Sequence, residues 1–130
     1  MEKVEKIKYN NLIQILIGSL VSCIFSLIFF FIFALVLSNT DVKESAIPTV
    51  TIITSIISIL IGSTISSKKL KRNGLLSGAC IGLIYISTLY ILSSCLLVGF
   101  KINIYSVLMI IGATISGSIG GIFGVNINRK

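Results

Sequence analysis

Charged residues are absent from four long blocks of the chain. The blocks cover residues 12–37, 45–67, 73–100 and 102–128, and Ile, Leu, Val, Phe, Gly, Ser and Thr dominate them. A helix rises about 1.5 Å per residue, so each block is long enough to cross a hydrocarbon layer about 30 Å thick. The pattern therefore predicts membrane-spanning helices at about residues 12–37, 46–67, 74–99 and 104–127.

The second block is so rich in Ile, Thr and Ser that residue propensity alone would favour a strand. However, it lacks the alternation of apolar and polar residues that a half-buried strand requires, and the open edge of a sheet cannot be satisfied in lipid. We therefore predict an all-α integral membrane protein. Its fold is expected to be a four-helix bundle made of two helical hairpins.

The chain has too few polar and charged residues to form a separate water-soluble domain. Of the 130 residues, 55% are apolar and only 12% are charged, and the mean hydropathy is +1.06. A soluble domain of this length would need a larger polar coat. We expect residues 1–130 to form a single membrane domain.

The residues at the block edges resemble helix boundaries. Ser45 is placed to cap the second helix, and Pro48 falls in its first turn, where the missing N–H leaves no broken hydrogen bond. Gly99 is expected to end the third helix and Asn103 to cap the fourth. The pair at 73–74, Asn-Gly, indicates a turn.

Basic residues predict the orientation. All but two of the eleven Lys and Arg residues lie at the chain ends or between the second and third blocks. They are Lys3, Lys6, Lys8, Lys68, Lys69, Lys71, Arg72, Arg129 and Lys130; the exceptions are Lys43 and Lys101. Because short basic flanks stay in the cytoplasm, both termini and the connector with Lys68, Lys69, Lys71 and Arg72 are expected there, in the cytoplasmic (cell) membrane.

The net charge of +7 does not indicate a nucleic-acid partner. The basic clusters lack interleaved aromatic residues, and topology would bring them to one membrane face. Anionic lipid headgroups attract nearby Lys and Arg by about 1 kcal/mol each. The expected partner of these clusters is the lipid bilayer.

Small residues recur four positions apart in every span. Residues at this spacing share one helix face, and small residues on such a face let helix backbones approach closely in lipid. The rows predict helix-packing faces and the tightest packing at the end that carries the basic clusters. The predicted packing residues are Gly18, Ser22, Ser58, Gly62, Ser66, Gly74, Gly78, Gly82, Gly112, Ser116, Gly120 and Gly124.

The spans lack the residues that enzymes and metal sites use most. There is no His, which removes the commonest general base and metal ligand near neutral pH. The three cysteines have no metal-binding spacing, and the least apolar span residues, Gln14 and Asn126, lie at headgroup level. We expect no catalytic residue, no cofactor and no metal.

Two segments carry a family resemblance. Residues 69–85 (KLKRNGLLSGACIGLIY) and 118–126 (SIGGIFGVN) resemble the YrzE-like family of small four-span membrane proteins from Firmicutes, although a lysine is usual where this chain has Asn73. The family has no established activity, so the resemblance implies no catalytic residues. Similar proteins are often encoded near an accessory subunit of the preprotein translocase, which implies an association with secretion.

These features favour a non-enzymatic membrane protein that acts through helix packing, with a homo-oligomer or another membrane protein as its partner. The alternative is a small transporter or channel that works as a homo-oligomer. In that case Thr54, Ser58 and Thr64 would line a hydrated path.

Overall fold

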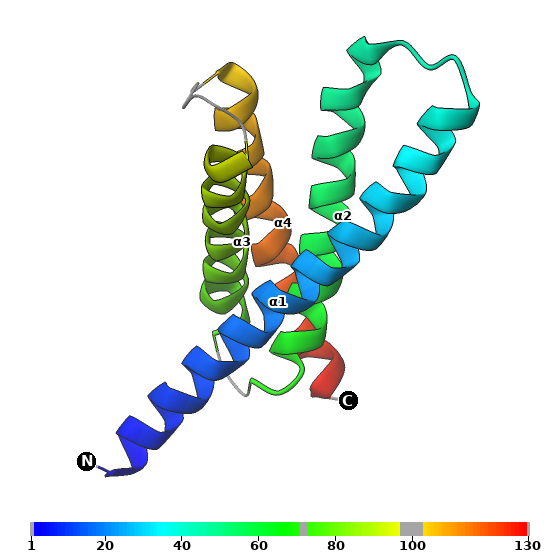
Figure 1. Ribbon diagram of the computed structural model, residues 1–130. Coiled ribbons are helices and arrows are strands. Elements are labelled where there is room, and N and C mark those ends of the chain that lie inside the picture. Colours follow the sequence, from blue (N-terminus) through cyan, green and yellow to red (C-terminus); the bar gives the residue numbers. More distant parts are fainter. Residues whose placement is uncertain (1, 71–72, 97–102, 130) are drawn as a thin grey trace.

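The part of the chain that the structure describes is almost entirely helical. The computed structural model describes residues 2–70, 73–96 and 103–129. It contains α1 (Glu2–Asn39), the short 3-10 turn η1 (Glu44–Ala46), α2 (Ile47–Ser67), α3 (Gly74–Leu96) and α4 (Ile104–Asn128) (Figure 1). Each α-helix is long and apolar enough to cross a membrane. The predicted all-α fold with four spanning helices is thereby confirmed.

The first helix is longer than the predicted span, and the predicted end of the third is not covered by the described residues. The first helix begins at Glu2 and not near residue 12, because the polar segment before the span contains no helix breaker and places Glu2 and Glu5 in the first turn, where acidic side chains favour the helix dipole. The described part of α3 ends at Leu96. The predicted end at residue 99, with Gly99, lies outside the described residues.

The expected cap at Ser45 is wrong. Ser45 lies inside η1, where the N–H of Ala46 donates to the carbonyl of Lys43 at 3.0 Å, and the N-cap of α2 is Ala46. The 3-10 turn has displaced the start of the helix past the serine. Pro48 does lie in the first turn, as expected.

The other two boundary signals lie where the sequence indicated. Asn73 has a φ of 60°, a left-handed conformation that asparagine tolerates better than most residues, and it turns the chain into α3. Asn103 is the N-cap of α4, although its side chain makes no capping hydrogen bond. Its carbonyl instead accepts from the N–H of Ser106 at 2.9 Å.

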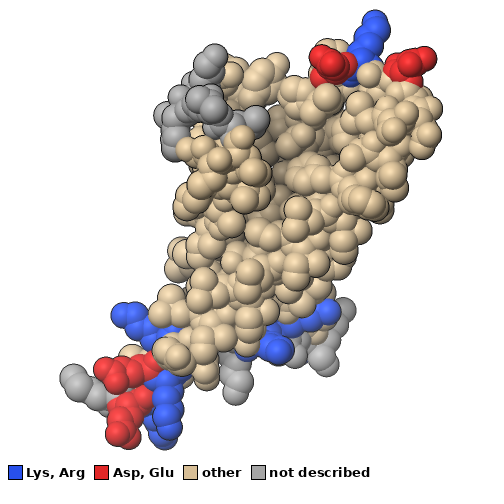
Figure 2. Space-filling view, in the orientation of Figure 1, with Lys and Arg blue, Asp and Glu red and all other residues tan. Residues whose placement is uncertain are grey.

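The helices form two antiparallel hairpins, α1–α2 and α3–α4, which meet chiefly through α2 and α4. Within the described residues, α1 contacts α2 and α3 but not α4. Both termini and the start of α3 lie at one end of the bundle, here called the terminal end, and η1 lies at the far end (Figure 1). Lys and Arg gather mainly at the terminal end (Figure 2).

The packed part of the bundle lies toward the terminal end. Among the described residues, none is buried in 27–39 of α1, 47–53 of α2, 87–96 of α3 or 104–112 of α4. The α1–α2 and α3–α4 hairpins diverge toward the far end (Figure 1). The tightest packing is thus at the end that carries most of the basic residues, as predicted.

The interior is small and polar while the outside is apolar. The buried apolar side chains are Ile59, Leu70, Ile81, Tyr85, Ile86 and Ala113, and the buried polar ones are Ser19, Ser22, Ser26, Thr54, Ser55, Ser58, Ser63, Ser66, Ser67, Ser77 and Ser116. Most Ile, Leu and Phe side chains of the spans are exposed. Such a surface suits a lipid solvent, in which apolar side chains gain little by turning inward.

Candidate functional site

The most distinctive feature of the molecule is a set of three close helix contacts, here called the α1–α2, α3–α4 and α2–α4 seams. In the α1–α2 seam, Gly18 faces Ser66 and Gly62 faces Ser22. A Cβ added to Gly62 would lie 2.8 Å from the carbonyl oxygen of Gly18, and one added to Gly18 would lie 2.8 Å from the Cβ of Ser66. Neither position has room for a larger residue.

Serine hydroxyls in the α1–α2 seam bond to backbone carbonyls. Ser22 donates to the carbonyl of Gly18 at 2.9 Å within α1, whereas Ser66 donates across the seam to the carbonyl of Gln14. A hydroxyl that bonds back to the backbone is satisfied without water. This arrangement explains how so many serines lie in the interior.

The α3–α4 seam is made of backbone against backbone. Gly74 faces Gly121, Gly78 faces Gly117, and Gly82 faces Ala113. A Cβ added to Gly78 would lie 2.7 Å from the carbonyl carbon of Gly117, and one added to Gly121 would lie 2.8 Å from that of Gly74. The pairs step by four residues along both antiparallel helices, so one continuous face of each helix is used.

The α2–α4 seam joins the two hairpins. A Cβ on Gly120 would lie 2.7 Å from the carbonyl oxygen of Leu60, and one on Gly124 would lie 2.7 Å from the Cβ of Ser67. The hydroxyl of Thr64 lies 2.7 Å from the carbonyl oxygen of Leu60 and 3.2 Å from that of Gly120. The second contact is a hydrogen bond between helices.

The predicted packing residues are buried, with one exception. Gly18, Ser22, Ser58, Gly62, Ser66, Gly74, Gly78, Gly82, Ser116, Gly120 and Gly124 are buried, and Gly112 is half-buried. A Cβ on Gly112 would lie 3.5 Å from the Cδ1 of Ile56, an ordinary van der Waals separation. The helix contact along the predicted row of α4 is therefore less close at Gly112, where the hairpins begin to diverge.

Sequence reasoning missed the face of α4 that contacts α3. That face consists of Ala113, Gly117 and Gly121, all buried. The signal was present, because these residues are also four apart and lie one position after the predicted row. A helix with two adjacent small-residue rows can pack closely against two neighbours, and α4 does so.

Tyr85 closes the packed region on its far side. It is the largest fully buried side chain among the described residues, and it clusters with Ile59, Ile86 and Ala113. Its hydroxyl lies 3.5 Å from the Oγ of Ser55.

Two fully buried hydroxyls, those of Ser58 and Ser67, have no hydrogen-bond partner within the described residues. The Oε1 atom of half-buried Gln14 likewise has no hydrogen-bond partner among the described residues.

Among the described residues, no cluster of three His, Cys, Asp or Glu side chains could hold a metal ion. Cys23, Cys80 and Cys95 are free thiols.

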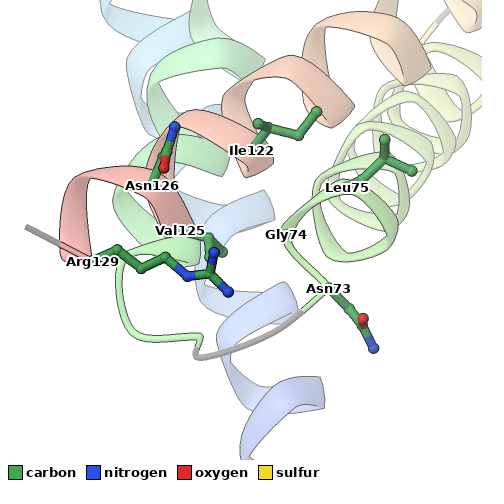
Figure 3. Close-up of a pocket in the computed structure, with 7 residues that line it drawn as sticks. All are labelled: Asn73, Gly74, Leu75, Ile122, Val125, Asn126 and Arg129. Carbon is green, nitrogen blue, oxygen red and sulfur yellow. The ribbon is translucent and has the colours of Figure 1, made fainter.

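The terminal end carries most of the charged surface (Figure 2). Lys68 and Lys69 are exposed there, whereas Lys71 and Arg72 lie outside the described residues. Beside the start of α3, a pocket of about 360 Å³ lies between α3 and α4. It is lined by Asn73, Gly74, Leu75, Ile122, Val125, Asn126 and Arg129 (Figure 3).

Neither a curated protein nor a solved structure matched this chain. A family model described as "Protein of unknown function (DUF3792)" matched residues 11–124. This match spans all three seams and most of the pocket lining. The chain therefore belongs to this family of unknown function, a membership that agrees with the expected resemblance to an uncharacterised family.

Proposed function

We propose that this chain is a non-enzymatic protein of the cytoplasmic membrane that acts by helix packing, either with a second copy of itself or with another membrane protein. Four apolar helices and an interior of hydroxyls and glycines support this function. The distribution of Lys and Arg supports cytoplasmic termini.

The observation that carries the proposal is the half-packed bundle. Toward the terminal end the small-residue faces are already paired within the chain. Toward the far end the helices diverge, and Figure 2 shows a hollow between their upper parts. A helix from a partner would fit between the two hairpins, whose far halves contain half-buried residues such as Phe33, Leu89 and Met109. The partner interface of this proposal is the far half of the bundle.

Association with the secretion machinery is the narrower form of the proposal. It is supported only by the resemblance of residues 69–85 and 118–126 to the YrzE-like family, whose members are often encoded near a translocase subunit. Affinity capture from gently solubilised membranes would test it, because a translocase component should be recovered with the tagged protein.

Photo-crosslinking in native membranes tests the proposed interface. A photoreactive amino acid at Phe33, half-buried in the far half of α1, is compared with one at Leu27, which is 63% exposed. Phe33 is expected to give a protein adduct larger than the monomer, and Leu27 only lipid adducts. Recovery of the monomer alone from both positions would count against the proposal.

A small transporter or channel is the second candidate. It is favoured by the buried hydroxyl of Ser58, which has no partner within the described chain. Of the other expected path residues, Thr54 is buried and Thr64 donates to carbonyls at the α2–α4 seam. Ion or solute flux in reconstituted vesicles that is lost in Ser58→Ala but kept in Ser87→Ala, an exposed serine, would favour this candidate over the first.

A further inference from the structure

The pocket between α3 and α4 at the terminal end changes character along its length. On α4 its lining residues are Ile122, Val125, Asn126 and Arg129. The last three lie three, four and seven positions after Ile122, so all four share one helix face. Arg129 lies about 10 Å along the axis from Ile122, at about 1.5 Å per residue. The pocket is therefore cationic at its mouth and apolar toward the membrane interior.

The charged group of the pocket is placed over its opening. Figure 3 shows the Arg129 side chain reaching from the end of α4 toward the start of α3, while Leu75 and Ile122 lie on the deeper side. The Asn73 side chain points away from the pocket, so its amide is free to contact the membrane surface (Figure 3). None of the seven described lining residues is acidic, and Arg129 is the charged residue among them.

Backbone donors add to the positive character of the opening. The carbonyl of Asn73 accepts from the N–H of Ser77 at 3.0 Å, at the N-terminus of α3. The N–H groups of Gly74 and Leu75 lie in the first turn of this helix, where backbone donors lack an intrahelical partner. Both residues line the pocket, and such N–H groups favour phosphate oxygens.

We propose that this pocket binds an anionic phospholipid. The Arg129 guanidinium pairs with the phosphate at headgroup depth, and an acyl chain follows the apolar wall of Leu75 and Ile122. A lipid matches the pocket because it carries charge and hydrocarbon in the same order along the membrane normal. Because the described lining holds Arg129 and no acidic residue, it favours an anionic headgroup over a zwitterionic one.

Native mass spectrometry of the purified full chain tests the assignment. The protein is mixed with phosphatidylglycerol or with phosphatidylcholine of the same acyl chains, and retained lipid is counted. Wild-type protein should retain more phosphatidylglycerol. Arg129→Gln should lower that retention about fivefold, the factor that corresponds to one cation at a membrane surface, and Arg129→Lys should lower it less.

Lys43→Gln is the matched control, because it removes one positive charge from an exposed residue that lies outside both the pocket and the basic clusters. It should leave retention unchanged. Three results would overturn the proposal. They are equal retention of the two lipids, equal losses in Arg129→Gln and Lys43→Gln, or release of the lipid by millimolar inorganic phosphate that is as complete as its release by excess phosphatidylglycerol. The last result would identify a free phosphate as the ligand.

Discussion

Gly78 of α3 and Gly117 of α4 lie with the α-carbon of each against the carbonyl group of the other. The relationship is reciprocal, since a Cβ on either residue would collide with backbone atoms of its partner. Contacts between a Cα hydrogen and a carbonyl oxygen contribute about 0.5–1 kcal/mol each. Because both sides of this contact are main chain, no side-chain rotation can relieve the clash that a larger residue would cause there.

Gly78→Ala should therefore destabilise the fold by about 1–3 kcal/mol, the usual range for overpacking. The matched variant is Gly112→Ala, whose new methyl group would lie in ordinary contact, 3.5 Å from Ile56. It should be neutral or stabilising by up to about 1 kcal/mol, the helix propensity difference between Gly and Ala. Unfolding by a denaturing detergent in mixed micelles measures both free energies. Equal effects of the two variants would show that close approach at Gly78 is not needed.

Gly120→Leu should impair folding or assembly far more than Ile119→Leu. Gly120 is buried, and a Cβ added to it would lie 2.7 Å from the carbonyl oxygen of Leu60. Ile119, in contrast, is 43% exposed. The leucine at position 120 would push α4 away from α2, while at position 119 it would point outward. Immunoblotting of membrane fractions gives the comparison. Equal accumulation of both variants would argue against the α2–α4 seam.

Thr64→Val tests the hydrogen bond that crosses the α2–α4 seam. The valine keeps the shape of the side chain but loses the donor to the Gly120 carbonyl at 3.2 Å. Such bonds between membrane helices average about 0.6 kcal/mol, and a loss of about that size is expected in the detergent unfolding assay. Thr88→Val is the control, because exposed Thr88 bonds only within its own helix, to Ile84 at 2.8 Å. A loss as large in the control would assign the effect to helix propensity.

The sequence was sufficient for the spans but not for the pairing of helices. In lipid, a charge-free block of more than twenty residues must satisfy its backbone hydrogen bonds internally, and a helix does so. The four helices therefore follow directly from the sequence. A row of small residues, in contrast, shows which face can be approached but not by which neighbour. The row with Gly120 was predicted, yet the adjacent row with Gly117 and Gly121 was not, because the choice between two equivalent rows depends on where α2 and α3 stand.

Local signals were reliable only where no competing structure was available. Asn73 turns the chain as its sequence context predicts, because the connection there is short. Ser45 does not cap α2, since the 3-10 turn at Glu44–Ala46 takes up the residues in which a cap would form. Among the pocket residues, Leu75 is far in sequence from Ile122 and Arg129, and only the α3–α4 seam brings it beside them.

Orientation can be tested by labelling with a membrane-impermeant maleimide. Cys23, Cys80 and Cys95 are first replaced by alanine, and a single cysteine is introduced at Asp41 or Lys68, which lie at opposite ends of the bundle and are both exposed. In intact cells Asp41→Cys should be labelled, and Lys68→Cys should react only after permeabilisation, because basic connectors remain in the cytoplasm.

Because both positions are exposed, this comparison reports the side of the membrane and not burial. Fast labelling of Lys68→Cys in intact cells would reverse the proposed orientation and place both termini outside. The seams would survive that result, since contacts such as Gly78 with Gly117 do not depend on which leaflet is adjacent. The lipid pocket would then lie in the outer leaflet, and its anionic ligand would have to be supplied from there.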